Sequence, residues 1–192
     1  MASPVGHLLL ALSCTGFRER SAEPWPALVW VVIVTACWAP DFDFVPGILI
    51  GDPNRYHHGA SHSLAGALLF SSAIALSLRK LTDNRVALGR IAFLAYTSHL
   101  LGDWLSIDTR APIGIPIFWP LNDSYFISPL LIFQDIRHGA DGTGLAGFLI
   151  EVFSIANLSA IGLELVITLP VLVAVEYARR RIRRGTKSVR IL

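Results

Sequence analysis

Charged residues are scarce in this sequence. They make up 16% of its 192 residues, whereas hydrophobic residues make up 53%, and soluble domains carry roughly 25% charged residues. Only two cysteines occur, Cys14 and Cys37, and we interpret them as small buried hydrophobic residues of different apolar runs. A positively charged start of the kind that signal peptides carry is missing, so no cleavable targeting segment is expected. These absences favour a single-domain membrane protein.

Long apolar runs supply the predicted membrane segments. They cover about residues 4–17, 25–39, 63–78, 88–105 and 145–178. A bilayer core requires ~20 apolar residues per helix, so the first two runs are short enough to be tilted or partly re-entrant. The last run exceeds one span, and we divide it near "NLS" into a piece at 145–157 and a spanning helix at 159–180, in which Pro170 is a place to bend. The prediction is an all-α polytopic bundle of about five helices, forming one domain over 1–192.

Basic residues are distributed unevenly among the connectors. The segments at 17–23 and 79–90 and the tail at about 179–192 hold 13 Lys or Arg, and the alternate connectors hold only Arg55, Arg110 and Arg137. The positive-inside rule therefore predicts a multi-pass protein of the cytoplasmic (inner) membrane, with its N-terminus outside and its C-terminus in the cytoplasm. Beside a membrane helix, the basic tail is expected to meet anionic lipid headgroups rather than nucleic acid.

Histidine and aspartate residues lie near one end of each of four apolar runs. They are His7, Asp41, Asp43, His57, His58, His62, His99 and Asp103. Because successive helices run in opposite directions, all eight positions are predicted at one membrane depth, on the outer face. Ionisable groups in membrane segments are costly and need partners. A mixed set of imidazoles and carboxylates suits zinc or another first-row divalent ion.

Several of these residues also have a simpler interpretation. His7 can be an interfacial residue, Asp41 beside Pro40 can cap a turn, and His99 can pair with Asp103 alone, since residues four apart share a helix face. Asp43 weakens this view, because two carboxylates beside an apolar helix repel each other unless a cation compensates them.

Other polar residues are expected to have structural roles. Glu164, deep in the last apolar run, should have a hydrogen-bonding partner, and Glu151 is expected either to form hydrogen bonds or to line the outer cavity. His138 lies in the Gly-rich stretch "RHGADGTG" and is predicted to be solvated.

Five motifs in order resemble those of a known family. The stretches "GHLLLA", "APDFD", "HHGASHSL", "SHLLGDWL" and "GIPIFWP", within residues 6 to about 126, are similar to the YdjM-like (LexA-regulated) family, whose members are described as membrane-bound metal-dependent hydrolases. The resemblance implicates His7, Asp41, Asp43, His57, His62, His99 and Asp103. The family usually has an Arg where this chain has His58, so recognition of an anion would fall to His58 or Arg55.

A more distant likeness concerns the order of the ligands. His, Asp, His and then His-x3-Asp on helices is similar to zinc-dependent phospholipase C and P1 nuclease, which use a cluster of metals on phosphodiesters. The further histidines of that group have no clear counterpart here, which implies one or two ions rather than three. The comparison is an analogy between sites.

These observations predict a metal-dependent hydrolase that cleaves a phosphoester of an amphipathic substrate, such as a phospholipid or a lipid-linked phosphate. Zinc is the expected ion and manganese the alternative. The first-choice ligands are Asp43, His62, His99 and Asp103, with His7 and Asp41 holding a second ion or orienting the first set. His57 is the expected proton donor, with His58 beside it in the catalytic role.

Two other classes of protein fit the same residues. One is a non-catalytic metal-binding or transport protein, in which the ligands hold an ion in transit. The other is a structural membrane protein whose polar cluster only ties helices together. A transporter should have polar groups along a path through the bilayer, whereas here they gather at one side, apart from Glu164.

Overall fold

The structure is a computed structural model, and it describes residues 1–16, 26–52, 54–137 and 144–189. Within these ranges the chain forms seven α-helices and three short 3-10 helices. The β structure of the same ranges is confined to two isolated bridges, between Ser106 and Phe133 and between Ile115 and Phe126. The predicted all-α class is therefore confirmed. The basic segment 17–23 and His138 lie outside the described residues.

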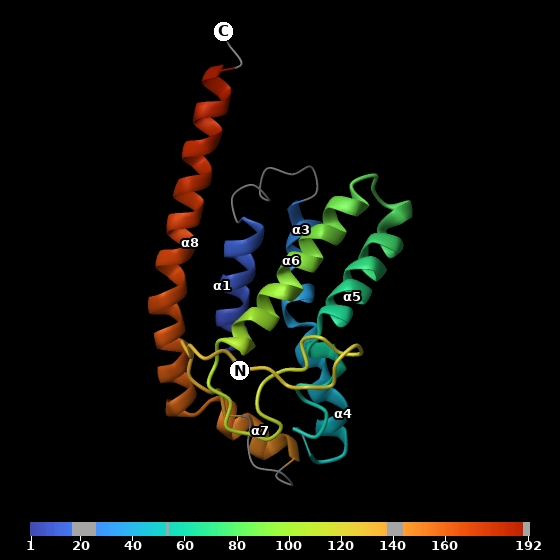
Figure 1. Cartoon of the computed structure of the whole chain (residues 1–192), viewed down its shortest axis with the longest axis vertical. Coiled ribbons are helices and arrows are strands. Elements are labelled where there is room, and N and C mark those ends of the chain that lie inside the picture. Colours follow the sequence, from blue (N-terminus) through green and yellow to red (C-terminus); the bar gives the residue numbers. More distant parts are fainter. Residues whose placement is uncertain (17–25, 53, 138–143, 190–192) are drawn as a thin grey trace.

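Five helices run alternately up and down the molecule (Figure 1). They are α1 (Pro4–Thr15), α3 (Pro26–Trp38), α5 (Leu64–Ser77), α6 (Arg85–Trp104) and α8 (Ile155–Val189). Their bounds lie close to the predicted apolar runs. The turn between α5 and α6, which includes η3 (Leu78–Lys80), lies at the upper end of the bundle in Figure 1, and the C-terminus extends above it.

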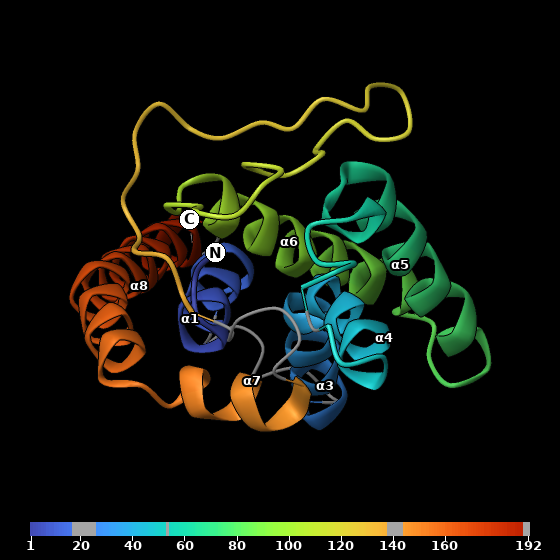
Figure 2. The same cartoon turned by 90° about the horizontal axis from the view of Figure 1, so that it is seen from below.

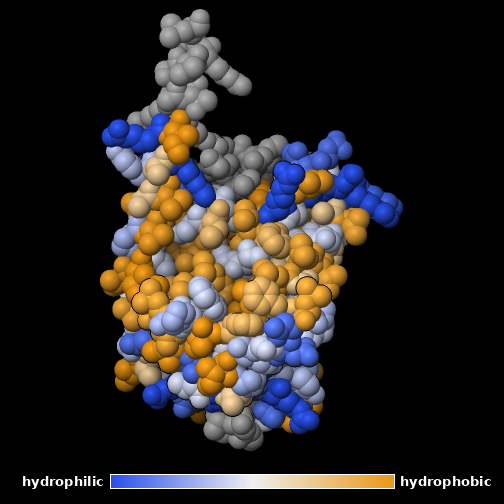
Figure 3. Space-filling model, viewed as in Figure 1, coloured by the Kyte–Doolittle hydropathy of each residue, from blue (hydrophilic) through white to orange (hydrophobic). Residues whose placement is uncertain are grey.

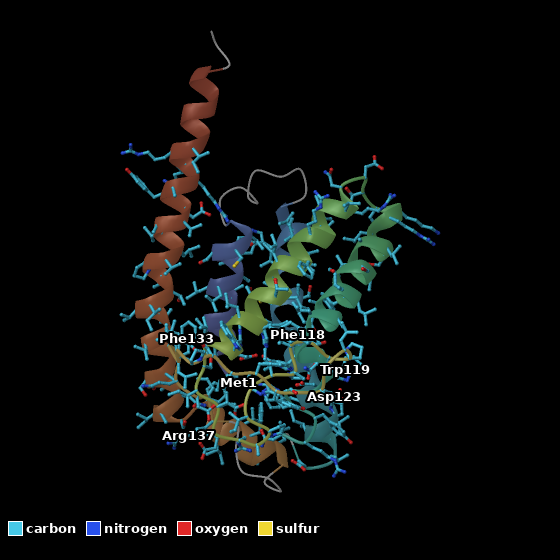
Figure 4. All side chains as sticks on the ribbon, viewed as in Figure 1. Met1, Phe118, Trp119, Asp123, Phe133 and Arg137 are labelled. Carbon is cyan, nitrogen blue, oxygen red and sulfur yellow. The ribbon has the colours of Figure 1, made fainter. Side chains whose placement is uncertain are left out.

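Shorter elements gather at the lower end of the bundle (Figure 1). They are η1 (Pro40–Asp43), α4 (Phe44–Leu49), η2 (Ala60–His62) and α7 (Gly144–Val152). A long connection between α6 and α7 passes the same end, as Figure 2 shows from below. Figure 4 places Trp119 and Asp123 of this connection on the α5 side and Phe133 on the α8 side.

The core of the bundle lies between α1, α3 and α6, where small side chains allow the helices to approach closely. It is formed by Ala11, Leu12, Val29, Val32, Ile33, Ala36, Cys37, Leu88, Ile91, Ala92 and Ala95. Ala11, Ala36, Ala92 and Ala95 are fully buried. This packing fixes the depth at which the lower ends of the three helices meet.

Helix α8 differs from the predicted division of the last apolar run. The break lies at Phe153 and Ser154, a few residues before the predicted "NLS", because Ile155 already begins α8. Pro170 lies inside α8, which continues through it. Only 17% of the most apolar window of Ile155–Ile182 is buried, and this is the one described helix long and apolar enough to cross a membrane. The pair Ala27–Trp38 and Pro40–Leu49 meets the same criteria together, with a bend of 53°.

Hydrophobic side chains form a band around the middle of the face shown in Figure 3, and hydrophilic residues lie above and below it. Val166 and Val173 of α8 are 72% and 67% exposed. Exposed apolar side chains in a continuous band indicate contact with lipid or with another protein rather than with water.

Candidate metal centre

The lower ends of four segments bring six of the predicted residues together. His7 comes from α1, Asp41 and Asp43 from η1, His62 from the end of η2, and His99 and Asp103 from α6. Hydrogen bonds hold these segments in place. Tyr96 of α6 donates to the carbonyl oxygen of Ser61 over 2.7 Å, which fixes η2 against α6. The cluster therefore depends on contacts between segments that are distant in the sequence.

Four side-chain atoms of this cluster lie at nearly equal separations. His99 Nε2 lies 3.4 Å from His62 Nε2 and 3.0 Å from Asp103 Oδ2, and His62 Nε2 lies 3.5 Å from Asp103 Oδ2. Asp41 Oδ1 is 3.6 Å from His62 Nε2 and 3.5 Å from His99 Nε2. Ligands placed 2.0–2.1 Å from a tetrahedral zinc ion lie about 3.4 Å apart. These five distances, between 3.0 and 3.6 Å, are close to the separation expected for ligands of one zinc ion.

Burial of these carboxylates requires a compensating group. The side chains of His62, His99 and Asp103 are fully buried, and that of Asp41 is 16% exposed. Asp41 Oδ1 and Asp103 Oδ2 are buried and accept no hydrogen bond from the described residues. An ionised carboxylate without a partner is costly to bury. The residues therefore fit a divalent cation at this point.

His7 lies against the opposite side of His99. The two rings stack with centroids 3.6 Å apart, and His7 Nε2 lies 3.4 Å from Asp103 Oδ1. Both ring nitrogens of His7 are buried and without a hydrogen bond. Gly102 gives the ring its space, because a Cβ there would lie 3.0 Å from His7 Cε1. His7 is therefore placed either to bind an ion together with Asp103 or to hold the ring of His99 in position.

Polar groups around the cluster orient both central imidazoles. His99 Nδ1 lies 2.7 Å from the carbonyl oxygen of Cys37, and His62 Nδ1 lies 3.1 Å from Asp43 Oδ2. Ser61 donates from Oγ to the same Asp43 oxygen over 2.9 Å. Each Nδ1 proton is then engaged, which leaves Nε2 as the free donor atom, as expected for metal-binding histidines. The sequence gives no signal for the Cys37 carbonyl, since any residue has one.

Electrostatics at η2 favour positive charge. Burial disfavours the charged form of His62, but the neighbouring carboxylates of Asp41 and Asp43 outweigh it and raise the pKa of the imidazole to about 9. Burial likewise opposes ionisation of Asp43, while hydrogen bonds from His57 and His62 bring the pKa of its carboxyl well below the usual range. A site that stabilises a proton in this way also stabilises a metal cation.

His57 and His58 border the cluster on the side of a cavity of about 560 Å³. His57 Nδ1 lies 2.9 Å from Asp43 Oδ1. Burial and the charge of His58 lower the pKa of His57 to about 3, despite the hydrogen bond to Asp43. The ring of His57 is thus held by Asp43 at the cavity, and its role as a proton donor stays a prediction.

His58 has an unusual backbone and a second partner. Its φ angle is +57°, in the left-handed region that residues with a side chain rarely adopt. Its Nδ1 lies 3.5 Å from Asp108 Oδ2. The pairing with Asp108 was not predicted from the sequence, because the two residues lie 50 positions apart in connectors without a regular pattern.

The two glutamates outside the cluster have different environments. Glu164 is fully buried and accepts hydrogen bonds from the backbone N–H of Ser3, at 2.6 Å, and from the Ser3 hydroxyl. The expected structural partner of Glu164 is thereby confirmed. Glu151 lies in α7 and is not among the residues that line the cavity beside His57 and His58.

Comparison with known families agrees with this arrangement. The family model described as YdjM inner membrane protein matches residues 1–182. The chain belongs to the YdjM family. No curated protein and no solved structure matches the chain. The match spans all six clustered residues and the apolar part of α8, so YdjM membership covers both the candidate centre and the helix able to cross the inner membrane.

Proposed function

We propose that this chain is a membrane-bound metal-dependent hydrolase that cleaves a phosphoester of a lipid. The proposal rests on the spacing of four buried atoms, which are His62 Nε2, His99 Nε2, Asp41 Oδ1 and Asp103 Oδ2. The side chains of His62, His99 and Asp103 are fully buried. Zinc is the ion that this set suits best, and manganese is the alternative.

The proposed ligand set differs from the first choice made from the sequence. Asp41 takes the place of Asp43, because Asp41 Oδ1 faces both Nε2 atoms and Asp43 faces Nδ1 of His62. Asp43 then orients His62, and His7 supports Asp103 and His99. A second ion beside His7 would use the other oxygen of Asp103.

The chemistry follows from the residues on the cavity side. A divalent ion in this set would supply Lewis acidity and bring the pKa of a bound water to ~7. His57 is held by Asp43 and lines the cavity, where it is placed to take part in proton transfer. His58 lies beside His57, with ring centroids 4.2 Å apart, and lines the same cavity together with Asp108. The two residues are placed to serve the leaving group.

Two features support a lipid as the substrate. The cavity is lined by residues of the lower end of the molecule, where hydrophilic residues lie below the hydrophobic band of Figure 3. Helix α4, at the same end, exposes Val45 and Leu49, and Leu49 is 80% exposed. Acyl chains would meet such a surface while a polar headgroup reaches the cavity.

The test compares hydrolysis by protein reconstituted in lipid discs before and after metal removal. We expect release of phosphate or headgroup from phosphatidic acid or a phosphodiester lipid, loss of this activity with a chelator, and recovery with zinc or manganese. Asp103→Asn should abolish both metal binding and activity. Asp123→Asn removes an exposed carboxylate of the same end and should change neither.

The outcomes separate the three classes of function. Activity that is indifferent to both the chelator and Asp103→Asn contradicts the proposed mechanism. Stoichiometric metal that is lost in Asp103→Asn, without hydrolysis of any phosphoester, would favour the metal-binding or transport protein. Protein without bound metal after exposure to zinc and manganese would favour a purely structural cluster.

A further inference from the structure

The cavity beside the cluster is built by two turns that the proposed metal centre does not use. One turn contributes residues 54–59 and the other contributes residues from 108–112, and Tyr125 and Asp135 complete the wall. Arg55 and Arg110 both line it, one from each turn. They are two of only three basic residues that the sequence places in the connectors of this side. The fold therefore brings Arg55 and Arg110 together at one cavity.

The acidic residues of the same cavity are largely committed to other partners. Asp108 Oδ1 accepts from the backbone N–H of Arg110, and its Oδ2 accepts from that of Gly114 over 2.7 Å. Asp135 accepts from the hydroxyl of Thr109. These bonds hold the second turn in shape and occupy the carboxylate oxygens. Asp52 is the remaining acid of the wall.

His58 adds a polar group that lacks a partner. Its ring is buried, its Nδ1 faces Asp108, and its Nε2 makes no hydrogen bond with any described residue. A buried nitrogen without a partner costs free energy, as does the left-handed backbone of this residue. Both costs are understandable where a ligand supplies the missing bond.

We propose that this cavity is an anion-binding subsite that holds a phosphate group of the substrate, bound by Arg55 and Arg110 beside the ring of His58. The inference rests on the proposed function and adds the substrate class, a headgroup that carries phosphate. Guanidinium groups bind phosphate through paired, charge-assisted hydrogen bonds, which few other anions match.

The subsite lies next to the proposed metal centre. The ring centroid of His62 is 4.8 Å from that of His58 and 5.0 Å from that of His57. His57 and His58 therefore border both the cavity and the metal centre. A phosphate held by the two arginines would lie beside these two rings.

Binding of inorganic phosphate to the zinc-loaded full chain in phosphatidylcholine discs tests the subsite without reference to catalysis. Calorimetry should give a saturable site in the wild type and an affinity at least about tenfold lower in Arg55→Gln and in Arg110→Gln. Arg137→Gln removes an exposed arginine of the same end that does not line the cavity, and it should bind as the wild type does. Zinc content should be equal in all four proteins.

A second arm identifies the source of the phosphate. Discs that contain phosphatidic acid should raise the apparent dissociation constant for inorganic phosphate if a lipid headgroup occupies the cavity. An unchanged constant in those discs would assign the subsite to a soluble phosphate compound. Equal phosphate affinity in the wild type and both cavity variants would overturn the inference.

Failure of the subsite and failure of the hydrolase are distinguishable. Arginine-dependent phosphate binding without hydrolysis would retain the subsite and reject the proposed function. Metal-dependent hydrolysis with the same KM in Arg55→Gln, Arg110→Gln and the wild type, together with unchanged phosphate binding, would retain the function and reject the subsite.

Discussion

At the residue scale, Asp41 and Asp43 have different surroundings although they are two positions apart in η1. Asp41 Oδ1 lies within 3.6 Å of Nε2 of both His62 and His99, and it accepts no hydrogen bond. Asp43 accepts from Ser61 and lies beside His57 and His62. One carboxylate is thus available to a cation, and the other is engaged by the protein.

This difference predicts unequal effects of two matched substitutions. Asp41→Asn should lower zinc affinity by more than about 100-fold, because it removes a charged ligand atom, whereas loss of an outer partner in Asp43→Asn should cost roughly 10–100-fold. Competition with a chromophoric chelator measures both constants. A larger loss in Asp43→Asn would restore Asp43 as the ligand.

Asp108 gives a prediction for pH dependence outside the membrane segments. Burial opposes its ionisation, but hydrogen bonds from His58 and from the backbone of Arg110 and Gly114 lower the pKa of the carboxyl from 3.8 to about 2. Since the folded-state pKa lies below the unfolded value, the stabilisation is present above about pH 4 and is lost as pH falls through 2.

Asp108→Asn should therefore be less stable than the wild type at neutral pH, by about 1–2 kcal/mol. The difference in melting temperature, followed by tryptophan fluorescence in detergent, should narrow from pH 5 to pH 2. Asp123→Asn, whose carboxylate is exposed, serves as the control. A difference that stays constant over this range would show that the ionised carboxylate contributes nothing.

The sequence indicates which residues form the cluster, but it does not indicate which of them are ligands and which orient the ligands. Each clustered histidine and aspartate is visible as a polar residue beside an apolar run. The direction of each carboxylate depends on the 3-10 geometry of η1, and the orientation of His99 depends on a backbone carbonyl of α3. Neither the geometry of η1 nor the position of this carbonyl follows from a pattern of side chains, so neither can be predicted from the sequence.

At the element scale, the contact between α1 and α8 sets the position of the N-terminal helix. Glu164 of α8 accepts from Ser3, whose own side chain accepts from the backbone N–H of Gly6 over 3.1 Å. A carboxylate at the N-terminus of a helix also interacts favourably with the helix dipole. Helix α1 then brings the backbone N–H of Ala2 to Asp103 Oδ1, at 3.2 Å.

Gly6→Ala tests this contact. The added Cβ would lie 2.6 Å from Glu164 Oε2, so α1 and α8 must separate or Glu164 must leave Ser3. We expect a loss of roughly 1–3 kcal/mol of stability and weaker metal binding, because His7 moves with α1. Thermal unfolding and chelator competition measure the two effects.

Gly162→Ala is the matched control for this substitution. It adds the same methyl group to α8 two residues before Glu164, where a Cβ would meet nothing within 4 Å. Alanine is the better helix former, so the variant should be as stable as the wild type or more so. Equal behaviour of the two variants would show that the Glu164 contact does not position α1.

The long elements and α7 were predictable, and the other short elements were not. The predicted apolar runs match α1, α3, α5 and α6 to within a few residues, because length and hydrophobicity fix such helices. The stretch "PDFDFVPGILIG" lies outside the predicted runs, yet it forms η1 and the six-residue α4. A helix this short has no periodicity to read and exists through its packing, as Phe44 against Phe148 of α7 shows.

At the scale of the whole molecule, alternating helix direction gathers the histidine and aspartate cluster at one end and most of the described basic residues at the other. The candidate centre and the cavity lie at the lower end, while the α5–α6 turn and the basic part of α8 lie at the upper end (Figure 1). Family membership places the protein in the inner membrane. The charge asymmetry then predicts which end faces the cytoplasm.

Cysteine labelling in intact cells tests this orientation. In a Cys14→Ser, Cys37→Ala background, Asn122→Cys marks the lower end and Asp83→Cys marks the α5–α6 turn, and both positions are exposed. A membrane-impermeant maleimide should label Asn122→Cys directly and Asp83→Cys only after the membrane is permeabilised. The reverse pattern would place the candidate centre in the cytoplasm, and its phosphoester substrate would then belong to the inner leaflet. Labelling of both positions in intact cells would mean that the bundle does not cross the bilayer between them, and α8 alone would be left as the membrane-spanning helix.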